Sequence, residues 1–302
     1  MKRDLQETIT YTQCPLCDSS NIHSKLKLKD HSISKENFSI YSCNDCSFLF
    51  TQSVPAEAYC GRYYQSEEYI SHSDTKEGVV AKLYHQVRDI MLDKKYQLIQ
   101  SLNTGKTLLD IGCGTGYFLN HMKGKGYTTL GIEVDDNARN YGIQKFGLEI
   151  LPPQALLDQQ ISPQFHIISL WHVLEHLYNP KNYMQLIRER LAKEGYVLIA
   201  LPNADCFDAQ HYKDYWAAYD TPRHLWHFTP KTLKKLAEES GFELVKMERL
   251  PFDPFYNCIL SAKYNESSLS LLSGGLLGLR SYLKSLSDIE KSSSLIYVLK
   301  AK

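Results

Sequence analysis

Short apolar runs alternate with amphipathic stretches from about residue 105 to the end of the chain. Apolar runs bounded by turn residues are typical of buried strands, whereas apolar positions three or four residues apart are typical of helices. The runs that we expect to form strands begin at Leu108 and continue at 128–132, 165–170, 195–200, 242–250 and 294–299. We expect helices at 79–102, 180–191 and 232–240. This order predicts an α/β fold with a doubly wound, parallel sheet.

The first of these strands runs directly into a turn that contains three glycines. The run L-L-D-I-G-C-G-T-G places Gly112, Gly114 and Gly116 on alternate positions after Asp110. Because glycine lacks a Cβ, a ligand can approach the backbone closely at such a turn. A dinucleotide-binding turn would need its third glycine one position later, where Tyr117 stands. The pattern D-x-G-x-G-x-G instead resembles the cofactor loop of class I S-adenosylmethionine-dependent methyltransferases.

A second acidic residue supports this resemblance. An adenosine ligand needs an acceptor for its ribose hydroxyls at the end of the next strand, roughly 20 residues further on. Glu133 stands there, directly after the run 128–132. Asp135 or Asp136 then provides a cap for the helix that follows. The resemblance therefore implies that Asp110, the three glycines and Glu133 bind S-adenosylmethionine.

Two C-x-x-C pairs lie near the N-terminus, Cys14 with Cys17 and Cys43 with Cys46. Each pair can present two sulfurs to one ion, and the 25 residues between the pairs suffice for a hairpin that brings them together. We expect these four thiolates to hold a structural zinc ion. A thioredoxin-like redox pair is the main alternative, and disulfides are disfavoured in a reducing cytoplasm.

Between these pairs, the segment Lys25–Lys29 alternates lysine with leucine at period two. The pattern predicts a strand with one apolar face and one lysine face. Lysines on an exposed edge strand block unwanted strand pairing. A basic surface that contacts RNA or an anionic acceptor is the alternative.

Composition limits the classes of partner. The chain has 302 residues, of which 43% are hydrophobic, and its 34 basic residues balance its 34 acidic ones. A chain with no net charge has no overall field that attracts polyanions, so nucleic acid binding is not favoured. The first residues contain no apolar signal region, and no run reaches about 18 apolar residues. We therefore expect a cytoplasmic protein with no membrane partner.

Two histidines follow the strand expected at 165–170, in the run W-H-V-L-E-H-L. The spacing H-x-x-E-H also occurs in a class of metallopeptidases, but there both histidines lie on a long helix, and here His172 directly follows a strand. In many class I methyltransferases a V-L-E-H-L segment lies beside the transferable methyl group. The resemblance implies that His172 faces the cofactor and His176 the acceptor. The alternative is that these rings only hydrogen-bond loop carbonyls.

A segment dense in aromatic and polar side chains, 215–228, follows the strand expected at 195–200. Open α/β sheets bind ligands at the carboxyl ends of their strands, so this loop and the loops after the earlier strands should meet in one crevice. Trp216, Tyr219, Arg223, His224 and His227 could all reach it. The alternative is that the tryptophans and Phe228 are core residues and that Arg223 pairs with Asp220. We expect at least His224 to line the pocket.

Taken together, the chain resembles bacterial methyltransferases that carry a zinc-binding segment ahead of a Rossmann-like domain with a seven-stranded sheet, including sugar-modifying enzymes. The predicted division is a zinc ribbon at 1–53, a tyrosine-rich lid and connecting helix at 54–104, and the methyltransferase domain at 105–302. This domain has an insertion at about 252–293, helical over 269–286, and the last strand, at 294–299, should be antiparallel.

The resemblance implies methyl transfer to a small-molecule acceptor, such as a sugar or glycan precursor, with His176 and His224 as candidate bases. The alternatives are a methyltransferase that acts on ribosomal RNA through its zinc ribbon and a cofactor-binding scaffold that transfers nothing. Two positions depart from the family pattern. His166 replaces the usual acidic residue at the strand expected at 165–170, and no acidic residue suited to adenine stands near 152–156.

Overall fold

The computed structural model describes residues 7–64, 79–161 and 164–302. Its centre is a seven-stranded sheet with the order β12-β13-β10-β9-β6-β7-β8. All strands are parallel except β13, which runs antiparallel to both of its neighbours, β10 and β12, as the sequence predicts. The strands of this sheet are β6 (Thr107–Ile111), β7 (Thr128–Ile132), β8 (Ile150–Leu151), β9 (Phe165–Trp171), β10 (Leu191–Pro202), β12 (Phe242–Arg249) and β13 (Ser294–Ala301).

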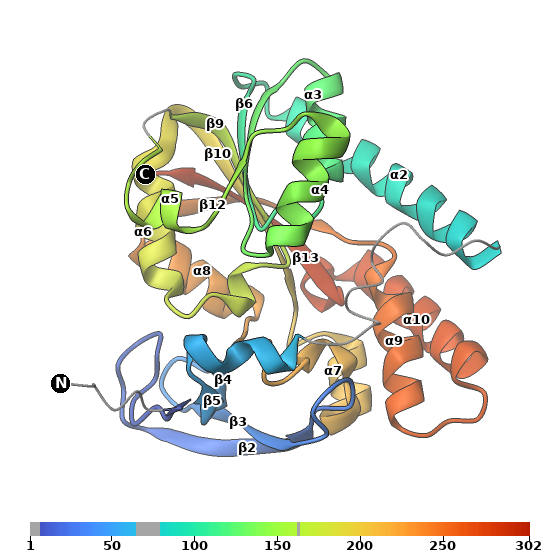
Figure 1. Ribbon diagram of the computed structural model, residues 1–302. Coiled ribbons are helices and arrows are strands. Elements are labelled where there is room, and N and C mark those ends of the chain that lie inside the picture. The colour runs from blue at the N-terminus through green and yellow to red at the C-terminus, as the bar shows by residue number, and fades with distance from the viewer. Residues whose placement is uncertain (1–6, 65–78, 162–163) are drawn as a thin grey trace.

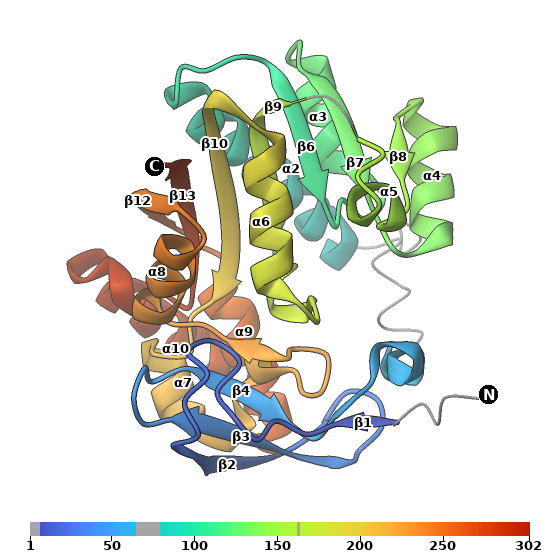
Figure 2. The same ribbon diagram turned by 90° about the vertical axis from the view of Figure 1, so that its left-hand side faces the viewer.

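Helices cover both faces of this sheet because successive strand residues point to opposite sides. On β6, Leu109 packs into the cluster shared with the helices α6 and α8, and Leu108 packs into the cluster shared with α2 and α3. Figure 2 shows α6 and α8 on one side of the strands. The helices flanking the sheet are α2 (Val79–Ser101), α3 (Tyr117–Gly124), α4 (Asp136–Phe146), α5 (Gln154–Leu157), α6 (Pro180–Arg190) and α8 (Pro230–Glu239).

Local sequence signals set where these helices begin. The Asp135 carboxylate accepts the backbone N–H of Ala138 at 2.7 Å, so Asp135 and not Asp136 is the N-cap of α4. Asn179 caps α6 in the same way, directly before Pro180. A side-chain acceptor at this position satisfies one of the free N–H groups of the first turn, and proline at the first helical position loses no hydrogen bond.

The N-terminal segment forms a second, antiparallel sheet with the order β11-β4-β3-β2. Its first three strands along the chain are β2 (Ile22–Lys29), β3 (Asn37–Cys43) and β4 (Leu49–Gln52), and β2 is an edge strand, as its lysine pattern predicts. The fourth strand, β11 (Trp226–His227), comes from the aromatic segment after β10 and pairs with β4. The ribbon expected at 1–53 therefore completes its sheet with residues of the methyltransferase domain.

Smaller elements connect the two sheets. A two-stranded ladder pairs β1 (Thr8–Ile9) with β5 (Val54–Pro55), and the 3-10 helix η1 (Glu57–Tyr63) follows it. The tyrosine-rich segment is described only as far as Tyr64, so the Tyr69 and 71–74 part of the expected lid lies outside the described residues. Short helical elements after β9 and β10 are η2 (Leu174–His176), α7 (Phe207–Tyr212), η3 (Lys213–Tyr215) and η4 (Ala217–Tyr219).

The insertion before β13 is a hairpin of two helices. It consists of α9 (Asp253–Tyr264) and α10 (Ser270–Ser287), followed by η5 (Ile289–Lys291). The sequence predicted the second helix but not α9, whose Pro254 occupies the first turn, where it needs no hydrogen-bond donor. In Figure 1 this hairpin lies at the outer side of the molecule beside α7. Within the described part of the chain, no helix combines the length and the apolar character needed to cross a bilayer.

Candidate functional site

The three glycines after β6 adopt positive φ angles of 72°, 54° and 81°, which other residues rarely adopt. They serve different purposes. A Cβ on Gly112 would collide with Val173, and one on Gly116 would lie 2.6 Å from Leu148 Cδ1. Only at Gly114 would a Cβ meet open space. Gly114 is therefore the position where a ligand can approach the turn, and the other two glycines allow the turn to pack.

Glu133, at the end of β7, is bound to this turn. Its carboxylate accepts backbone N–H groups from Gly114 at 2.7 Å, Val134 at 2.8 Å and Asp135 at 3.0 Å. These bonds fix the carboxylate beside Gly114 and occupy three of its roughly four lone-pair positions. The side chain thus stands where the sequence places a ribose acceptor, and it retains capacity to accept a hydroxyl.

Asp110 is a buried residue of β6, two positions before Gly112. Its carboxylate accepts the hydroxyl of Ser169 at 2.6 Å. Burial raises the pKa of Asp110 to about 7, against the opposing effects of this hydrogen bond and of the positive charge of Lys95. Lys95, from α2, lies 4.0 Å from the centre of the Trp171 ring, and burial lowers its pKa to about 8. Asp110 therefore ties β6 to β9 just before the glycine turn.

His172 follows β9 with a positive φ of 58°. Its ring lies between two carboxylates, with Nδ1 3.5 Å from Glu175 Oε1 and Nε2 3.3 Å from Asp253 Oδ2. Burial alone would lower its pKa, but the hydrogen bonds and negative charges of these carboxylates raise it to about 10. The residue is therefore an imidazolium at neutral pH, and its charge stabilises Glu175.

Glu175 is a site residue that the sequence interpretation missed. Its side chain is 1% exposed, and neither carboxylate oxygen has a hydrogen-bond partner among the described residues. Burial opposes its ionisation, but His172 and the neighbouring histidines hold its pKa below the usual value. The His172 imidazolium at 3.5 Å compensates its charge, and the carboxylate oxygens keep the capacity to accept further hydrogen bonds. The signal available in the sequence was its place in the H-x-x-E-H run.

His176 and His224 meet at this carboxylate. Their ring centres are 4.6 Å apart, and the ligand atoms of Glu175, His176 and His224 all lie within 4.8 Å of one another. His176 Nδ1 is 3.0 Å from the carbonyl of Arg223, and His224 Nδ1 is 2.9 Å from the carbonyl of Ala218. Both rings therefore bond loop carbonyls, as one alternative proposed, but only through Nδ1.

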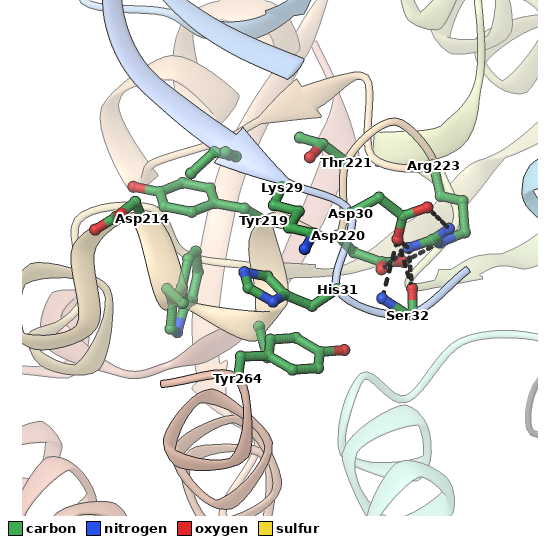
Figure 3. Close-up of a pocket in the computed structure, with 13 residues that line it drawn as sticks. Lys29, Asp30, His31, Ser32, Asp214, Tyr219, Asp220, Thr221, Arg223 and Tyr264 are labelled. Carbon is green, nitrogen blue, oxygen red and sulfur yellow. Dashed lines mark hydrogen bonds and ion pairs between the residues drawn. The ribbon is translucent and has the colours of Figure 1, made fainter. Parts of the chain in front are cut away.

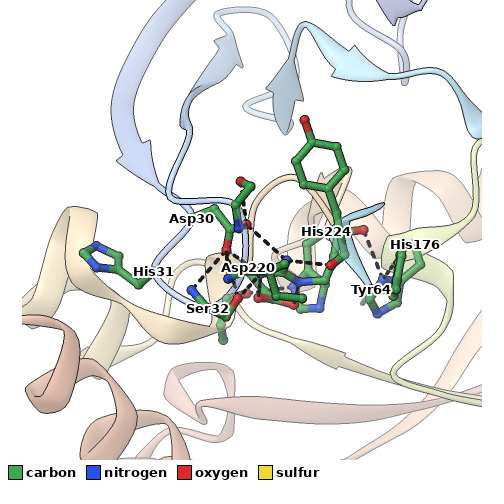
Figure 4. Close-up of polar contacts among 12 residues, drawn as sticks. Asp30, His31, Ser32, Tyr64, His176, Asp220 and His224 are labelled. Atoms are coloured by element: carbon green, nitrogen blue, oxygen red, sulfur yellow. Dashed lines mark hydrogen bonds and ion pairs between the residues drawn. The ribbon is translucent and has the colours of Figure 1, made fainter. Parts of the chain in front are cut away.

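These bonds determine the protonation of the two rings. A carbonyl only accepts, so each Nδ1 carries a hydrogen, and in a neutral ring such as that of His176 the Nε2 atom keeps its lone pair. Burial and the neighbouring His224 lower the pKa of His176 to about 4, which keeps its ring neutral at physiological pH. The hydroxyl of Tyr64, from the expected lid, lies 3.3 Å from His176 Nδ1 (Figure 4).

The aromatic segment divides between core and site. Trp216, Trp226 and Phe228 are at most 2% exposed, and His227 is buried with Nε2 2.9 Å from the hydroxyl of Thr51. These residues pack the two sheets together and do not reach the crevice. Tyr219 is also buried, so among the candidates of this segment only His224 joins the cluster with Glu175.

Arg223 belongs to a buried ion network. It donates to Asp30 at 2.9 Å, to Asp220 at 2.9 Å through Nε, and to the carbonyl of Tyr63 at 3.0 Å. Figure 3 shows Asp30, Ser32 and Asp220 around its guanidinium, next to a pocket that Tyr264 also lines. The Arg223 guanidinium is paired with the Asp30 and Asp220 carboxylates. We therefore interpret this pocket as part of the contact between the N-terminal segment and the segment after β10, and not as a second reaction site.

The four cysteines of the two C-x-x-C pairs converge as predicted. Cys14 Sγ lies 3.6 Å from Cys46 Sγ, Cys17 Sγ lies 3.6 Å from Cys43 Sγ, and all four sulfurs are within 4.8 Å of one another. Sulfurs of a tetrahedral zinc site with bonds of about 2.3 Å are about 3.8 Å apart. A disulfide would bring two sulfurs to about 2.05 Å. The arrangement fits a tetrahedral metal ion.

His166, which replaces the usual acidic residue, bonds the hydroxyl of Thr107 at 2.8 Å and contacts Gly105. It lies where β9 begins and therefore at the opposite edge of the sheet from the glycine turn. After β8, Ala155 and Leu156 of α5 are buried. These apolar side chains cannot hydrogen-bond adenine.

Residues 83–247 match the profile of a family described as a methyltransferase domain, and this match covers more than half of the chain. The chain belongs to this methyltransferase family. It is an S-adenosylmethionine-dependent enzyme. Its curated relatives include ubiquinone biosynthesis O-methyltransferases of Idiomarina loihiensis and Dinoroseobacter shibae, which are 23% and 29% identical. The alignments cover 53% and 50% of this chain and 70% and 65% of the relatives.

Solved structures support the fold of this methyltransferase. Magnesium protoporphyrin IX methyltransferase of Synechocystis, with bound S-adenosylhomocysteine, superposes with a TM-score of 0.52 at 11% identity, over 80% of this chain and 97% of that chain. A methyltransferase of Thermotoga maritima, described as a possible histamine N-methyltransferase, gives a TM-score of 0.50 at 15% identity, over 80% and 99%. The predicted Rossmann-like fold is confirmed.

Proposed function

We propose that this methyltransferase transfers a methyl group to a hydroxyl of a small molecule bound at Glu175, His176 and His224. The observation that carries this proposal is the buried Glu175 carboxylate, which pairs with His172 at 3.5 Å, makes no shorter hydrogen bond among the described residues and lies beside His176 and His224. An acceptor with two neighbouring hydroxyls could bind both the carboxylate and an imidazole. One hydroxyl can donate to the Glu175 carboxylate while the other donates to an imidazole Nε2.

The cofactor side of the reaction would be held by the turn after β6. Gly114 leaves space for the ligand, Glu133 would accept ribose hydroxyls, and Gly112 and Gly116 let the turn pack, while Asp110 ties the end of β6 to Ser169 of β9. When bound, S-adenosylmethionine supplies an electrophilic methyl group on a sulfonium. His172 adds a positive charge near this region, and its main partners are Glu175 and Asp253.

The protein's own part in the reaction is alignment and proton removal. The site would hold the acceptor hydroxyl against the methyl group that the cofactor supplies, and Nε2 of His176 or His224 would take the hydroxyl proton. His176, whose pKa burial and His224 lower to about 4, is in the form that can accept a proton at neutral pH.

Two classes of acceptor fit these groups. The curated relatives are named for ubiquinone biosynthesis, which favours a phenolic hydroxyl, and the resemblance found in the sequence favours a sugar or glycan precursor. Sugars, and phenols that carry a second hydroxyl beside the first, offer the adjacent hydroxyls that the Glu175 site could bind. An RNA acceptor is not favoured, because the chain has no net charge to attract a polyanion.

We further propose that Cys14, Cys17, Cys43 and Cys46 hold zinc. This ion would have a structural role, because four thiolates leave no open coordination position. The sheet next to it is small, and metal binding stabilises such segments. Reduced thiolates also suit the cytoplasmic location that the sequence predicts.

The proposed reaction can be tested with the full-length, zinc-loaded protein. Labelled S-adenosylmethionine would be offered with catechols, quinol precursors, sugar nucleotides and ribosomal RNA. We expect transfer to a vicinal diol and its loss in Glu175→Gln, with affinity for S-adenosylhomocysteine unchanged. Transfer to RNA alone, or transfer that is indifferent to Glu175→Gln, would refute the proposal.

A further inference from the structure

Helix α10 exposes an uninterrupted row of leucines. Five leucines of the helix and Leu269 at its N-cap are between 44% and 64% exposed, and they are separated by alternating steps of three and four residues. This spacing places them along one side of a helix. A large apolar row on the surface of a protein usually marks an interaction site. The row consists of Leu269, Leu272, Leu276, Leu279, Leu283 and Leu286.

The orientation of α10 is fixed by its opposite side. Gly274, Gly278, Ser281 and Ser285 are buried there. A Cβ at Gly274 would lie 2.5 Å from Ile259 Cα of α9, and one at Gly278 would lie 2.8 Å from the backbone of the same helix. Such close backbone packing admits only small residues, so α10 cannot rotate its leucines inward. The leucine row therefore faces outward as a consequence of how the hairpin is built.

The charges of α10 identify the partner. The helix contains two basic residues, Arg280 and Lys284, and no acidic residue. Both basic side chains lie at the same margin of the leucine row and over the ring of Phe207, at 5.2 Å and 4.8 Å from its centre. The other margin carries Tyr282. Leucines bordered by basic residues and tyrosine are typical of helices that lie in the interface of a lipid bilayer.

We propose that α10 docks on the surface of a bilayer that contains anionic phospholipids. The leucines would enter the boundary of the acyl chains, and Arg280 and Lys284 would contact the negative headgroups. The sequence interpretation excluded a membrane partner because no segment is long enough to span a bilayer, but a helix that lies in the surface needs no such segment.

Pairing with a second copy explains the surface less well. The steps of three and four residues match a coiled-coil seam, but α10 has 18 residues, fewer than the three to four heptads that such a seam needs. The positions that flank the seam include Arg280 and offer no acidic residue to pair with it. Two copies would bring like charges together, whereas anionic lipid neutralises them.

This docking would also place the reaction site near the membrane. Helix α9 packs along α10 and begins at Asp253, whose carboxylate lies 3.3 Å from His172. The hairpin thus connects the exposed leucines to the cluster around Glu175. The docking site itself does not depend on the proposed reaction, because binding to lipid can be measured without an acceptor.

The test is flotation of the full-length protein with vesicles of phosphatidylcholine alone or mixed with phosphatidylglycerol. We expect binding to the mixed vesicles that weakens with salt. Leu276→Gln combined with Leu283→Gln should lower binding at least about tenfold, and Arg280→Gln combined with Lys284→Gln should lower it roughly tenfold. Val245→Gln, at a 50% exposed position on β12, is the matched control and should bind normally.

Folding and oligomeric state are measured on the same samples. All variants should keep the thermal midpoint and the affinity for S-adenosylhomocysteine of the unmodified protein, because the altered side chains are exposed. Absence of binding to both kinds of vesicle would overturn the proposal. So would a dimer in sedimentation experiments that the leucine double variant dissociates, since the row would then be a subunit interface.

Discussion

Arg223 and Asp30 form a buried ion pair across 193 residues of sequence, with Arg223 Nη2 2.9 Å from Asp30 Oδ1. Asp30 lies in the N-terminal sheet at the end of β2, and Arg223 directly precedes His224. The carbonyl of Arg223 also accepts from His176 Nδ1. Although burial alone would raise it, the pKa of Asp30 is held well below its usual value by Arg223 and by the Ser34 backbone N–H. One residue thus connects the N-terminal sheet to both candidate bases.

Replacing Arg223 by methionine should therefore affect both folding and activity. The change leaves Asp30 and Asp220 charged without their main partner, which should cost about 3–5 kcal/mol of unfolding free energy. Denaturant titration measures this loss. In the double variant Asp30→Asn with Arg223→Met the loss should be smaller, because one uncompensated charge is gone. Equal losses in the two variants would show that the ion pair is not what Arg223 contributes.

Removing the metal from the four cysteines should disturb the reaction site as well as the N-terminal sheet. Thr51 of β4 donates its hydroxyl to the carbonyl of His224 at 2.7 Å, and β4 pairs with β11. We expect a chelator to lower the thermal midpoint and the rate of methyl transfer together, and added zinc to restore both. Cys46→Ser should reproduce the effect, whereas Cys60→Ser should not. Metal analysis that finds no zinc in active protein would contradict this prediction.

Much of the fold could be predicted from local patterns. The glycine turn, the alternation of strands and helices, and the paired cysteines are signals contained within short segments, so β6, Glu133 and the cysteine cluster were found. The role of Glu175 could not be predicted, because its unsatisfied carboxylate depends on where His172, His224 and Asp253 come together from three loops. The pairing of β11 with β4 is missed for the same reason. Trp216 looks like a site residue locally, and only the tertiary structure shows it buried.

Glu133 should control affinity for the cofactor. Its carboxylate is positioned by three backbone N–H groups and lies beside Gly114, where a ligand can enter. Glu133→Ala should weaken binding of S-adenosylhomocysteine by roughly tenfold to a hundredfold in calorimetry, as expected for the loss of hydrogen bonds to a charged group. Glu149→Ala, an exposed residue two positions before Leu151 of β8, is the control. Unchanged affinity in Glu133→Ala would remove this residue from the cofactor site.

His172 should stabilise the folded protein in a pH-dependent manner. Its folded-state pKa, raised to about 10 by Asp253 and Glu175 despite its burial, exceeds the ordinary value of 6.5. A group whose pKa is raised by folding stabilises the folded state fully at a pH below its unfolded-state pKa. This stabilisation is lost as the pH rises through the folded-state pKa. The side chain is partly exposed, so after screening by solvent we expect about 1 kcal/mol.

The thermal midpoint of His172→Gln should therefore differ most from that of the unmodified protein near pH 6. The difference should shrink steadily as the pH approaches 10. His23→Gln, which changes an exposed histidine on β2, should show no such trend. A difference that stays constant between pH 6 and 10 would mean that His172 is not charged in the folded state.

Replacing His176 or His224 by asparagine should slow methyl transfer without lowering the affinity for the cofactor. Loss of a base lowers the turnover number by roughly 10²–10⁴-fold, and the larger loss identifies the ring that takes the proton. Because burial and His224 lower the pKa of His176 to about 4, the rate should stay level down to about pH 5 and fall only below it if His176 is the base. A rate that falls with a midpoint near 6.5 would point to a ring with an unshifted pKa and would exclude His176. His23→Asn is the control for turnover, and equal rates in all three variants would mean that the hydroxyl loses its proton to water.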